Sequence, residues 1–353
     1  MLKQPFDHRI SSQWLKGDGP EGDIIVSSRV RLARNLAQYP FPILATDSQA
    51  KELRDKVQQA VQAPGWDALG RLHMVNMEQL TPLEKRVMVE KHLLSPALAE
   101  ESRYGGIIYT EDESVSIMIN EEDHLRIQCL FSGKQLRQAL QRAMHIDDLL
   151  EQTLVYAFDE KWGYLTSCPT NVGTGIRASV MIHLPGLVLT QQINRILSAI
   201  SKVGLVVRGI YGEGSEAQGN LFQISNQITL GLSEDEIIDN IDRVVGQIVR
   251  QERAAREHLL QNSQAKLEDR VFRSLGVLTH ARIIDSKEAA QRISDVKLGI
   301  DLGLIRHVKA NMNELLIMTQ PGYLQKIAGK TLTGDERDLV RAQMIREWLA
   351  SQH

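Results

Sequence analysis

The sequence lacks the features that mark several protein classes. Its 353 residues include only two cysteines, Cys129 and Cys168, too few for a disulfide framework and suited to a reducing compartment. No apolar run approaches the ~20 residues of a membrane-spanning helix, and residues 1–9 lack the apolar core of a signal peptide. The formal net charge is only −3, which gives no overall attraction to nucleic acid or anionic lipid. We therefore expect a cytoplasmic protein that binds neither nucleic acid nor membrane directly.

A complete glycine-rich phosphate-binding loop is also missing. Residues 329–331 (Gly-Lys-Thr) end like such a loop, but Leu324 stands where its first glycine must fall. Gly212 and Gly214 are not followed by a third glycine at the required spacing. If this chain binds a nucleotide, residues other than a glycine-rich loop must therefore hold its phosphates.

The chain has the composition of an ordinary globular protein, with 42% hydrophobic and 24% charged residues, and length for roughly two domains. Period-two alternation predicts strands, and apolar residues at helical spacing predict helices between them. Near residue 260 the strand pattern stops and the remainder is typical of helices. We predict an α+β fold, with an antiparallel β-sheet flanked by helices in residues 1–258 and an all-helical C-terminal domain in residues 259–353. The strands are expected at 24–34, 105–109, 115–119, 125–131, 204–208 and 221–225, and the helices of the first domain at 47–63, 81–94, 133–152, 190–203 and from 233.

The stretch 166–185 combines a cysteine, a glycine-rich turn and an arginine between two apolar runs. Gly173 and Gly175 allow positive φ and let backbone N–H groups approach an anion. Cys168 and Arg177 would then lie at opposite ends of one tight loop. The alternative is an ordinary hairpin connection with a buried cysteine.

Two other stretches place like charges together. Arg29 and Arg31 are two apart on a strand and therefore share one face, where they repel each other unless an anion lies between them. The turn 120–126 has three adjacent carboxylates followed by Arg126, which costs energy unless a cation neutralises them. The alternatives are solvated arginines at a sheet edge and a solvated acidic hairpin tip.

Three further stretches carry weaker candidates for functional residues. The glycine-dense loop that carries Glu213 is long and polar, which is more typical of a functional flap than of scaffold. His92 ends a helix, where a lone histidine is more often a packing residue. Arg337 and Arg341 share one face of the last predicted helix with Asp338 beside them, which by itself fits a salt-bridged surface helix.

Together these stretches resemble the guanidino phosphotransferase (phosphagen kinase) family, and most closely its bacterial branch that acts on arginine in proteins. The segment 168–177 (Cys-Pro-Thr-Asn-Val-Gly-Thr-Gly-Ile-Arg) is similar to the family's highly specific C-P-[ST]-N-[LIV]-G-T-x-[LIV]-R signature. Four further stretches agree in order and spacing, namely 28–31, 120–126, 208–213 and 224–226. The resemblance covers roughly residues 20–255.

The resemblance implies a glutamine-synthetase-like catalytic core and transfer of the γ-phosphate of Mg-ATP to a guanidinium. Five arginines would bind the phosphates, each with a planar fork of donors, and His92 is a weaker candidate for the same pocket. The implied arginines are Arg29, Arg31, Arg126, Arg177 and Arg208. The other implied nucleotide contacts are Ser28, Val30, Ala178, Ser179, Val180, Met181, Gly209 and Gly212. Mg²⁺ would come with the nucleotide, and no protein-held metal is expected.

On the acceptor side the resemblance implies Glu122 and Glu213 as a clamp around the guanidinium. A guanidinium with a pKa of ~13.8 must lose a proton as it attacks, and a carboxylate can orient it and accept that proton. We favour Glu122 as the base. Cys168 would act as a thiolate stabilised by surrounding cations, without covalent catalysis.

The sequence departs from the small-molecule enzymes in informative ways. Arg29 leaves no room for their N-terminal helical domain, so we expect a site open to an arginine on a protein. Met181 stands where those enzymes usually have a histidine against the adenine, and 214–215 (Gly-Ser) replaces a bulkier pair. The C-terminal hundred residues have no phosphagen-kinase counterpart, and the segment 337–342 resembles a phosphoarginine-binding motif. Its implied binding residues are Arg337, Asp338, Arg341 and Ala342.

The resemblance further implies partners: proteins with exposed arginines, including a heat-shock transcriptional repressor, a small zinc-binding activator, a Clp-type protease complex and further copies of the chain. Two other functions stay open. One is a phosphagen kinase acting on a free guanidino compound, and the other is a protease adaptor that reads phosphoarginine without catalysis.

Overall fold

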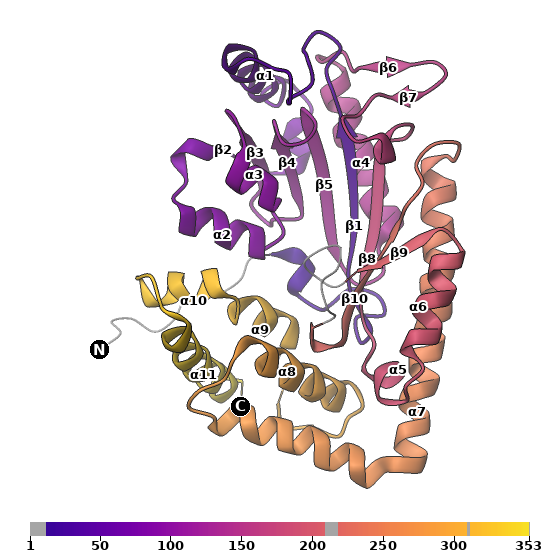
Figure 1. Ribbon diagram of the computed structural model, residues 1–353, viewed down its shortest axis with the longest axis vertical. Helices are drawn as coiled ribbons and strands as arrows, with labels where there is room; N and C mark the ends of the chain where they lie inside the picture. The colour runs from indigo at the N-terminus through magenta and orange to yellow at the C-terminus, as the bar shows by residue number, and fades with distance from the viewer. Residues whose placement is uncertain (1–11, 209–217, 309–310, 353) are drawn as a thin grey trace.

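A computed structural model describes residues 12–208, 218–308 and 311–352. Within these residues the centre is one eight-stranded antiparallel sheet in the order β2-β3-β4-β5-β1-β8-β10-β9, and β6 and β7 form a separate small hairpin (Figure 1). The strands are β1 (Ile25–Arg34), β2 (Leu72–Asn76), β3 (Gly106–Thr110), β4 (Val115–Ile119), β5 (Leu125–Ser132), β6 (Phe158–Asp159), β7 (Gly163–Tyr164), β8 (Ile176–His183), β9 (Leu205–Arg208) and β10 (Leu221–Asn226). The predicted strands are confirmed.

The helices begin where the sequence supplies caps. Thr81 and Ser233 each form a capping box with the glutamate three residues later, which satisfies two backbone donors at the start of α2 and α7. The helices are α1 (Asp47–Ala60), α2 (Pro82–Glu90), α3 (Pro96–Glu101), α4 (Leu136–Glu151), α5 (Pro185–Leu189), α6 (Ile193–Lys202), α7 (Glu234–His280), α8 (Ser286–Asp301), α9 (Met312–Met318), α10 (Pro321–Ala328) and α11 (Gly334–Ala350). Among the described residues no helix is both long and apolar enough to cross a bilayer.

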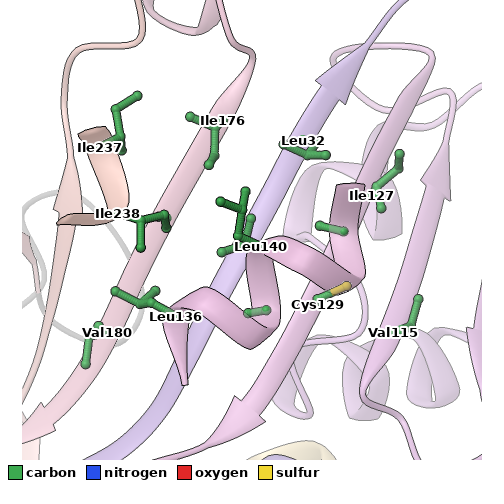
Figure 2. Packing of buried hydrophobic residues seen from close by; sticks show 14 of the residues in the cluster. Leu32, Val115, Ile127, Cys129, Leu136, Leu140, Ile176, Val180, Ile237 and Ile238 are labelled. Atoms are coloured by element: carbon green, nitrogen blue, oxygen red, sulfur yellow. The ribbon is translucent and has the colours of Figure 1, made fainter. Parts of the chain in front are cut away.

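One face of the sheet forms the main core against α4 and the first part of α7. Leu32 of β1, Ile127 of β5 and Val180 of β8 point to this face and meet Leu140 and Ile238 from the helices (Figure 2). Burial of each such side chain stabilises the fold by ~1.5–3 kcal/mol. Because side chains alternate along a strand, the intervening residues are directed to the opposite face.

The C-terminal helices form a second core with the end of α7, and this core also takes in Met181 and Leu221 from the sheet. A hydrogen-bonded contact joins the two parts: the N–H groups of Gly322 and Tyr323, at the start of α10, donate to the carboxylate of Glu90 at 2.7 and 2.9 Å. The predicted class, an antiparallel sheet flanked by helices with a helical C-terminal region, is confirmed.

The long helix α7 runs through the predicted domain boundary at residue 258. It has one non-helical residue, Ser263 (φ −146°, ψ 27°), and Figure 1 shows the bend between its two arms. The boundary therefore falls within a helix, and its use as a division between domains stays a prediction.

Candidate active site

The face of the sheet opposite the main core carries the predicted arginines. β1 lies between β5 and β8, in the interior of the sheet, so the alternative of solvated arginines at a sheet edge is wrong. Arg31 lies directly opposite Arg177, and Ala33 directly opposite Arg126. Residues paired in this way share one face of an antiparallel sheet. Strand register thus gathers guanidinium groups that are far apart in sequence.

The arginine cluster is electrostatically costly in itself. Arg29 donates to Ser179 Oγ at 3.4 Å and to Gln223 Oε1 at 3.1 Å, both neutral groups. Burial, with Arg177 and Arg126 nearby, lowers the pKa of Arg29 to about 10. Burial and the neighbouring arginines also lower the pKa of Arg31 well below its ordinary value. Like charges brought together on a half-buried face favour binding of a polyanion between them.

The acidic turn divides its carboxylates between two roles. The side chain of Glu121 is 4% exposed. Its carboxylate accepts one hydrogen bond from Arg126 Nη1 and another from the hydroxyl of Ser95, both at 2.8 Å. Glu122 is 45% exposed and lies 3.2 Å from Arg126 Nη2. Burial raises the pKa of Glu122, and Arg126 opposes that shift. Glu121 thus positions Arg126, while Glu122 remains accessible as a proton acceptor, which contradicts the alternative of a solvated hairpin tip.

The signature loop is fixed to the acidic turn at its cysteine end. Asp123 is fully buried, and its Oδ1 accepts the N–H of Ser167 and the amide of Asn35, both at 2.7 Å. Cys168, the next residue, is partly exposed, with its Sγ 3.0 Å from Thr170 Oγ1. The alternative of a buried structural cysteine is therefore wrong for Cys168.

The other end of the loop is held against β1. Arg34 points away from the arginine face into the core, where it forms a 2.6 Å ion pair with Asp147 and donates to Thr174 O at 3.0 Å. Gly175 has φ +66°, and a Cβ there would lie 2.6 Å from both Ala33 O and Arg34 Nη1. Only glycine allows this close approach, which sets the spacing between the loop and β1.

These elements enclose a cavity of about 170 Å³. Its walls bring together Cys168 and Glu122 from the predicted acceptor side and four of the five predicted phosphate-binding arginines. The lining residues are Arg31, Ala33, Glu122, Arg126, Cys168, Thr170, Asn171, Gly175, Arg177 and Arg208. Arg29 is on the same face but does not line this cavity.

Other predicted nucleotide contacts are distributed differently. The side chains of Val30, Ala178 and Val180 lie in the main core, on the face away from the cavity. Ser28 is buried, and its hydroxyl donates to Gly133 O at 2.7 Å and accepts the N–H of Gln135 at 2.9 Å, so it joins β1 to the start of α4. Gly209, Gly212 and Glu213 lie outside the described residues.

His92 and Met181 line a separate small cavity beside the arginine face. Burial, together with Arg29 and Arg31, lowers the pKa of His92 to about 3. The imidazole is therefore neutral near pH 7, and it lies 5.3 Å, centroid to centroid, from the ring of Trp14.

The C-terminal arginine motif lies on α11. Arg341 is 2% exposed, pairs with Asp338 and donates to the backbone carbonyls of Thr319 (3.0 Å) and Ile284 (2.9 Å). Arg337 is half-buried and donates to Leu332 O at 3.0 Å. Ala342 is buried. The role of these residues in binding phosphoarginine stays a prediction.

Sequence reasoning missed the residues that hold the site in shape. Arg34 lies on the core side of β1. In the sequence it is a charged residue at a position where the strand alternation calls for an apolar one, and this could have indicated a buried ion pair. Asp123 belongs to the acidic turn, but its neighbours gave no indication that it would hold the cysteine loop. Asp147 lies on α4 among apolar residues and carries the same signal as Arg34.

Within the described ranges, no group of three or more His, Cys, Asp or Glu is placed to hold a metal ion.

Two family models match the chain. The ATP:guanido phosphotransferase C-terminal catalytic domain matches residues 52–255, and the protein-arginine kinase McsB C-terminal domain matches residues 264–353. Among curated relatives, the protein-arginine kinase of Brevibacillus brevis is 60% identical over 99% of this chain and 98% of its own length. That of Halalkalibacterium halodurans is 60% identical over 98% of this chain and 97% of its own length.

Solved structures show the same fold. The chain is similar to the duplicated taurocyamine kinase from Schistosoma mansoni with bound transition-state analogue components (TM-score 0.60, 25% identity, 67% of this chain and 34% of that chain). It is also similar to lombricine kinase (TM-score 0.59, 24% identity, 67% of this chain and 68% of that chain). Each of these two likenesses covers 67% of this chain.

Proposed function

The chain belongs to the family of protein-arginine kinases, which carry the ATP:guanido phosphotransferase catalytic domain, and from this membership we propose that it transfers the γ-phosphate of ATP to arginine side chains of proteins. One observation carries the proposal. A single cavity is lined by Cys168 and Glu122 together with Arg31, Arg126 and Arg177. Groups suited to a cationic acceptor thus lie beside groups suited to an anionic donor.

The arginine face would bind the phosphates of Mg-ATP. Phosphoryl transfer requires little covalent help from the protein, but it requires neutralised charge and in-line positioning. The guanidinium groups of Arg29, Arg31, Arg126, Arg177 and Arg208 supply that charge from β5, β1 and β8, which are neighbours, and from β9, which lies beyond β10. Mg²⁺ would arrive on the phosphates and add positive charge between them.

The acceptor guanidinium would lie between Glu122 and Cys168. As one of its nitrogens attacks the γ-phosphorus, Glu122 takes the proton from that nitrogen, the bond from phosphorus to the β-phosphate oxygen breaks, and ADP leaves. The raised pKa of Glu122 makes this carboxylate a better proton acceptor. Cys168, as a thiolate, would pair with the guanidinium and hold its orientation. Glu213 is proposed as the second carboxylate of the clamp.

A protein substrate is favoured over a free guanidino compound because the full-length relatives are protein-arginine kinases. A non-catalytic adaptor is disfavoured because the acceptor residues and the arginines meet in one cavity. We further propose a cytoplasmic location, a homo-oligomeric state, and phosphorylation that marks proteins for a Clp-type protease and silences a heat-shock repressor, under a zinc-binding activator. These partners follow from the resemblance of the sequence.

The direct test is incubation with Mg-ATP and either casein or free arginine, followed by phosphorus NMR for an acid-labile phosphoramidate. The proposal predicts the signal on casein. A signal on free arginine alone would favour the phosphagen-kinase alternative, and no signal on either would favour the adaptor.

Cysteine variants provide a matched pair for the site. Cys168→Ala should lower transfer to casein by ~10²-fold or more, because the thiolate is lost from the acceptor side. Cys129→Ala is the control, since Cys129 is fully buried in the core and burial raises the pKa of its thiol. Equal activity of the two variants would remove Cys168 from the mechanism.

A further inference from the structure

An apolar groove of about 320 Å³ lies beside the signature loop, at the end of the sheet where Figure 1 shows the hairpin of β6 and β7. One wall is this hairpin, with Phe158 and Trp162, and the other is the segment 229–232, with Leu230 and Leu232. The four apolar side chains are 57%, 46%, 45% and 41% exposed, in that order. Large apolar side chains gathered in solvent around a groove indicate an interaction surface.

Both walls of the groove are bonded to the signature loop. The N–H of Tyr164 donates to Gly173 O at 2.8 Å, and a Cβ on Gly163 would lie only 2.6 Å from the same oxygen. From the other wall, the hydroxyl of Thr229 donates to Val172 O at 2.7 Å. The signature loop therefore holds the two walls, and their apolar side chains, in fixed positions.

The same loop also lines the candidate active site. Cys168, Thr170 and Gly175 belong to the cavity that contains Glu122, whereas Gly173 and Thr174 belong to the groove. One short stretch of backbone thus separates the place proposed for the acceptor guanidinium from the apolar groove. A free guanidino compound would end within the first cavity. A polypeptide continues beyond it on both sides of the arginine, so its neighbouring residues must lie against the rim.

We infer that this groove binds apolar side chains that flank the acceptor arginine in a protein substrate. The inference rests on the proposed function, because it assumes that an arginine side chain enters the cavity beside Cys168. Trp162 and Phe158 are suited to the role, since aromatic side chains are enriched among the residues that contribute most to protein interfaces. The groove would therefore select among arginines by the residues around them.

The contribution of the groove should appear in substrate binding and not in chemistry. Burial of a leucine or phenylalanine side chain against Trp162 and Leu232 should tighten binding by ~10-fold or more. Because this contact is the same before and during phosphoryl transfer, it should lower KM and leave kcat unchanged.

The test compares two arginine peptides of equal length and net charge as acceptors for the full chain with Mg-ATP. One peptide has leucine and phenylalanine at several positions on both sides of the arginine, and the other has serine at those positions. Wild type should show a kcat/KM ~10-fold higher for the apolar peptide, through KM. Trp162→Ser should remove most of this preference and leave the rate on the serine peptide unchanged. Phe272→Ser is the matched control, because Phe272 is 45% exposed on α7 and does not line the groove.

Leu232→Ser tests the opposite wall and should also reduce the preference, whereas Trp162→Phe should keep most of it. Equal kcat/KM for the two peptides in wild type would overturn the inference and leave the proposed kinase activity standing. Absence of phosphorylation on both peptides and on casein would overturn both. An intact preference in Trp162→Ser and Leu232→Ser, with a smaller particle mass by light scattering, would assign the groove to contacts between copies of the chain and overturn the inference. Thermal melting of each variant separates loss of a contact from loss of the fold.

Discussion

Arg31 and Arg34 lie three residues apart on the same strand and have opposite surroundings. Arg31 faces other arginines, which together with burial lower its pKa, and its Nε has no hydrogen-bond partner among the described residues. Arg34, on the other face, is bound by Asp147 and two backbone carbonyls and covers the ring of Tyr164 at 3.5 Å. A buried arginine with a carboxylate is part of the scaffold. The face of β1 on which burial and neighbouring arginines lower the pKa values of Arg29 and Arg31 is instead suited to binding an anion.

The largest expected effect comes from removing the scaffold arginine, Arg34. Arg34→Met should lower the free energy of unfolding by about 3–5 kcal/mol, because Asp147 is left as an unpaired buried charge. Urea denaturation measures the change. The double variant Arg34→Met, Asp147→Leu is the control and should recover most of the loss. A stable single variant would contradict the structural role of the pair.

The binding side should respond in activity and not in stability. Arg31→Met should lower phosphoryl transfer by ~10²- to 10³-fold, since a positive group facing the phosphates is removed. Its thermal stability should stay equal to wild type or rise, because repulsion from Arg29, Arg126 and Arg177 is relieved. Activity assays and melting of the same preparation measure both. A large drop in melting temperature would place Arg31 with the scaffold.

The C-terminal arginines, Arg337 and Arg341, sharpen the comparison. The sequence groups them in one motif, but in the structure they have different surroundings: Arg341 is buried and Arg337 is only half-buried. Arg341→Met should cost about 2 kcal/mol of stability, because two buried backbone carbonyls lose a charged donor. Arg337→Met should cost less than about 1 kcal/mol, since one half-buried contact is lost. Titration of Arg337→Met with free phosphoarginine then tests the predicted motif. Unchanged affinity would remove Arg337 from it.

The smallest expected effect concerns pH, through His92 beside the binding arginines. Its pKa is about 3 in the folded protein and ~6.5 when unfolded, so between these values only the unfolded state takes up the proton. Stability should therefore fall as the pH drops below ~6.5, with at most about 1.4 kcal/mol per pH unit from this group. His92→Gln should reduce the loss between pH 6.5 and 5.5 by about 1 kcal/mol in urea denaturation. The same slope in both proteins would contradict a buried, neutral His92.

The arginine face could be predicted because strand alternation and family spacing are local properties of the sequence. Arg29 and Arg31 were placed on one face by their separation alone. The encounter of Arg31 with Arg177 depends on which strands are neighbours and in what register, which the spacing along either strand does not contain.

The supporting contacts could not be predicted for the same reason. Asp123 holds the backbone at Ser167, 44 residues further along the chain, and Asn313 helps to line the small cavity beside His92. Such contacts arise from tertiary packing and leave no periodic pattern. The roles that the resemblance assigns to site residues, including Glu122, Cys168, Glu213 and the phosphoarginine motif, remain predictions.

The helix α7 has a consequence for how this chain can change over evolutionary time. Its 47 residues give a contour of about 70 Å, at ~1.5 Å and ~100° per residue, from the back of the catalytic sheet to the C-terminal helices. Insertion of a single residue in its first arm would turn everything beyond it by roughly 100° and separate Glu90 from the start of α10. Substitutions on its exposed side should therefore be tolerated, whereas insertions and deletions should not.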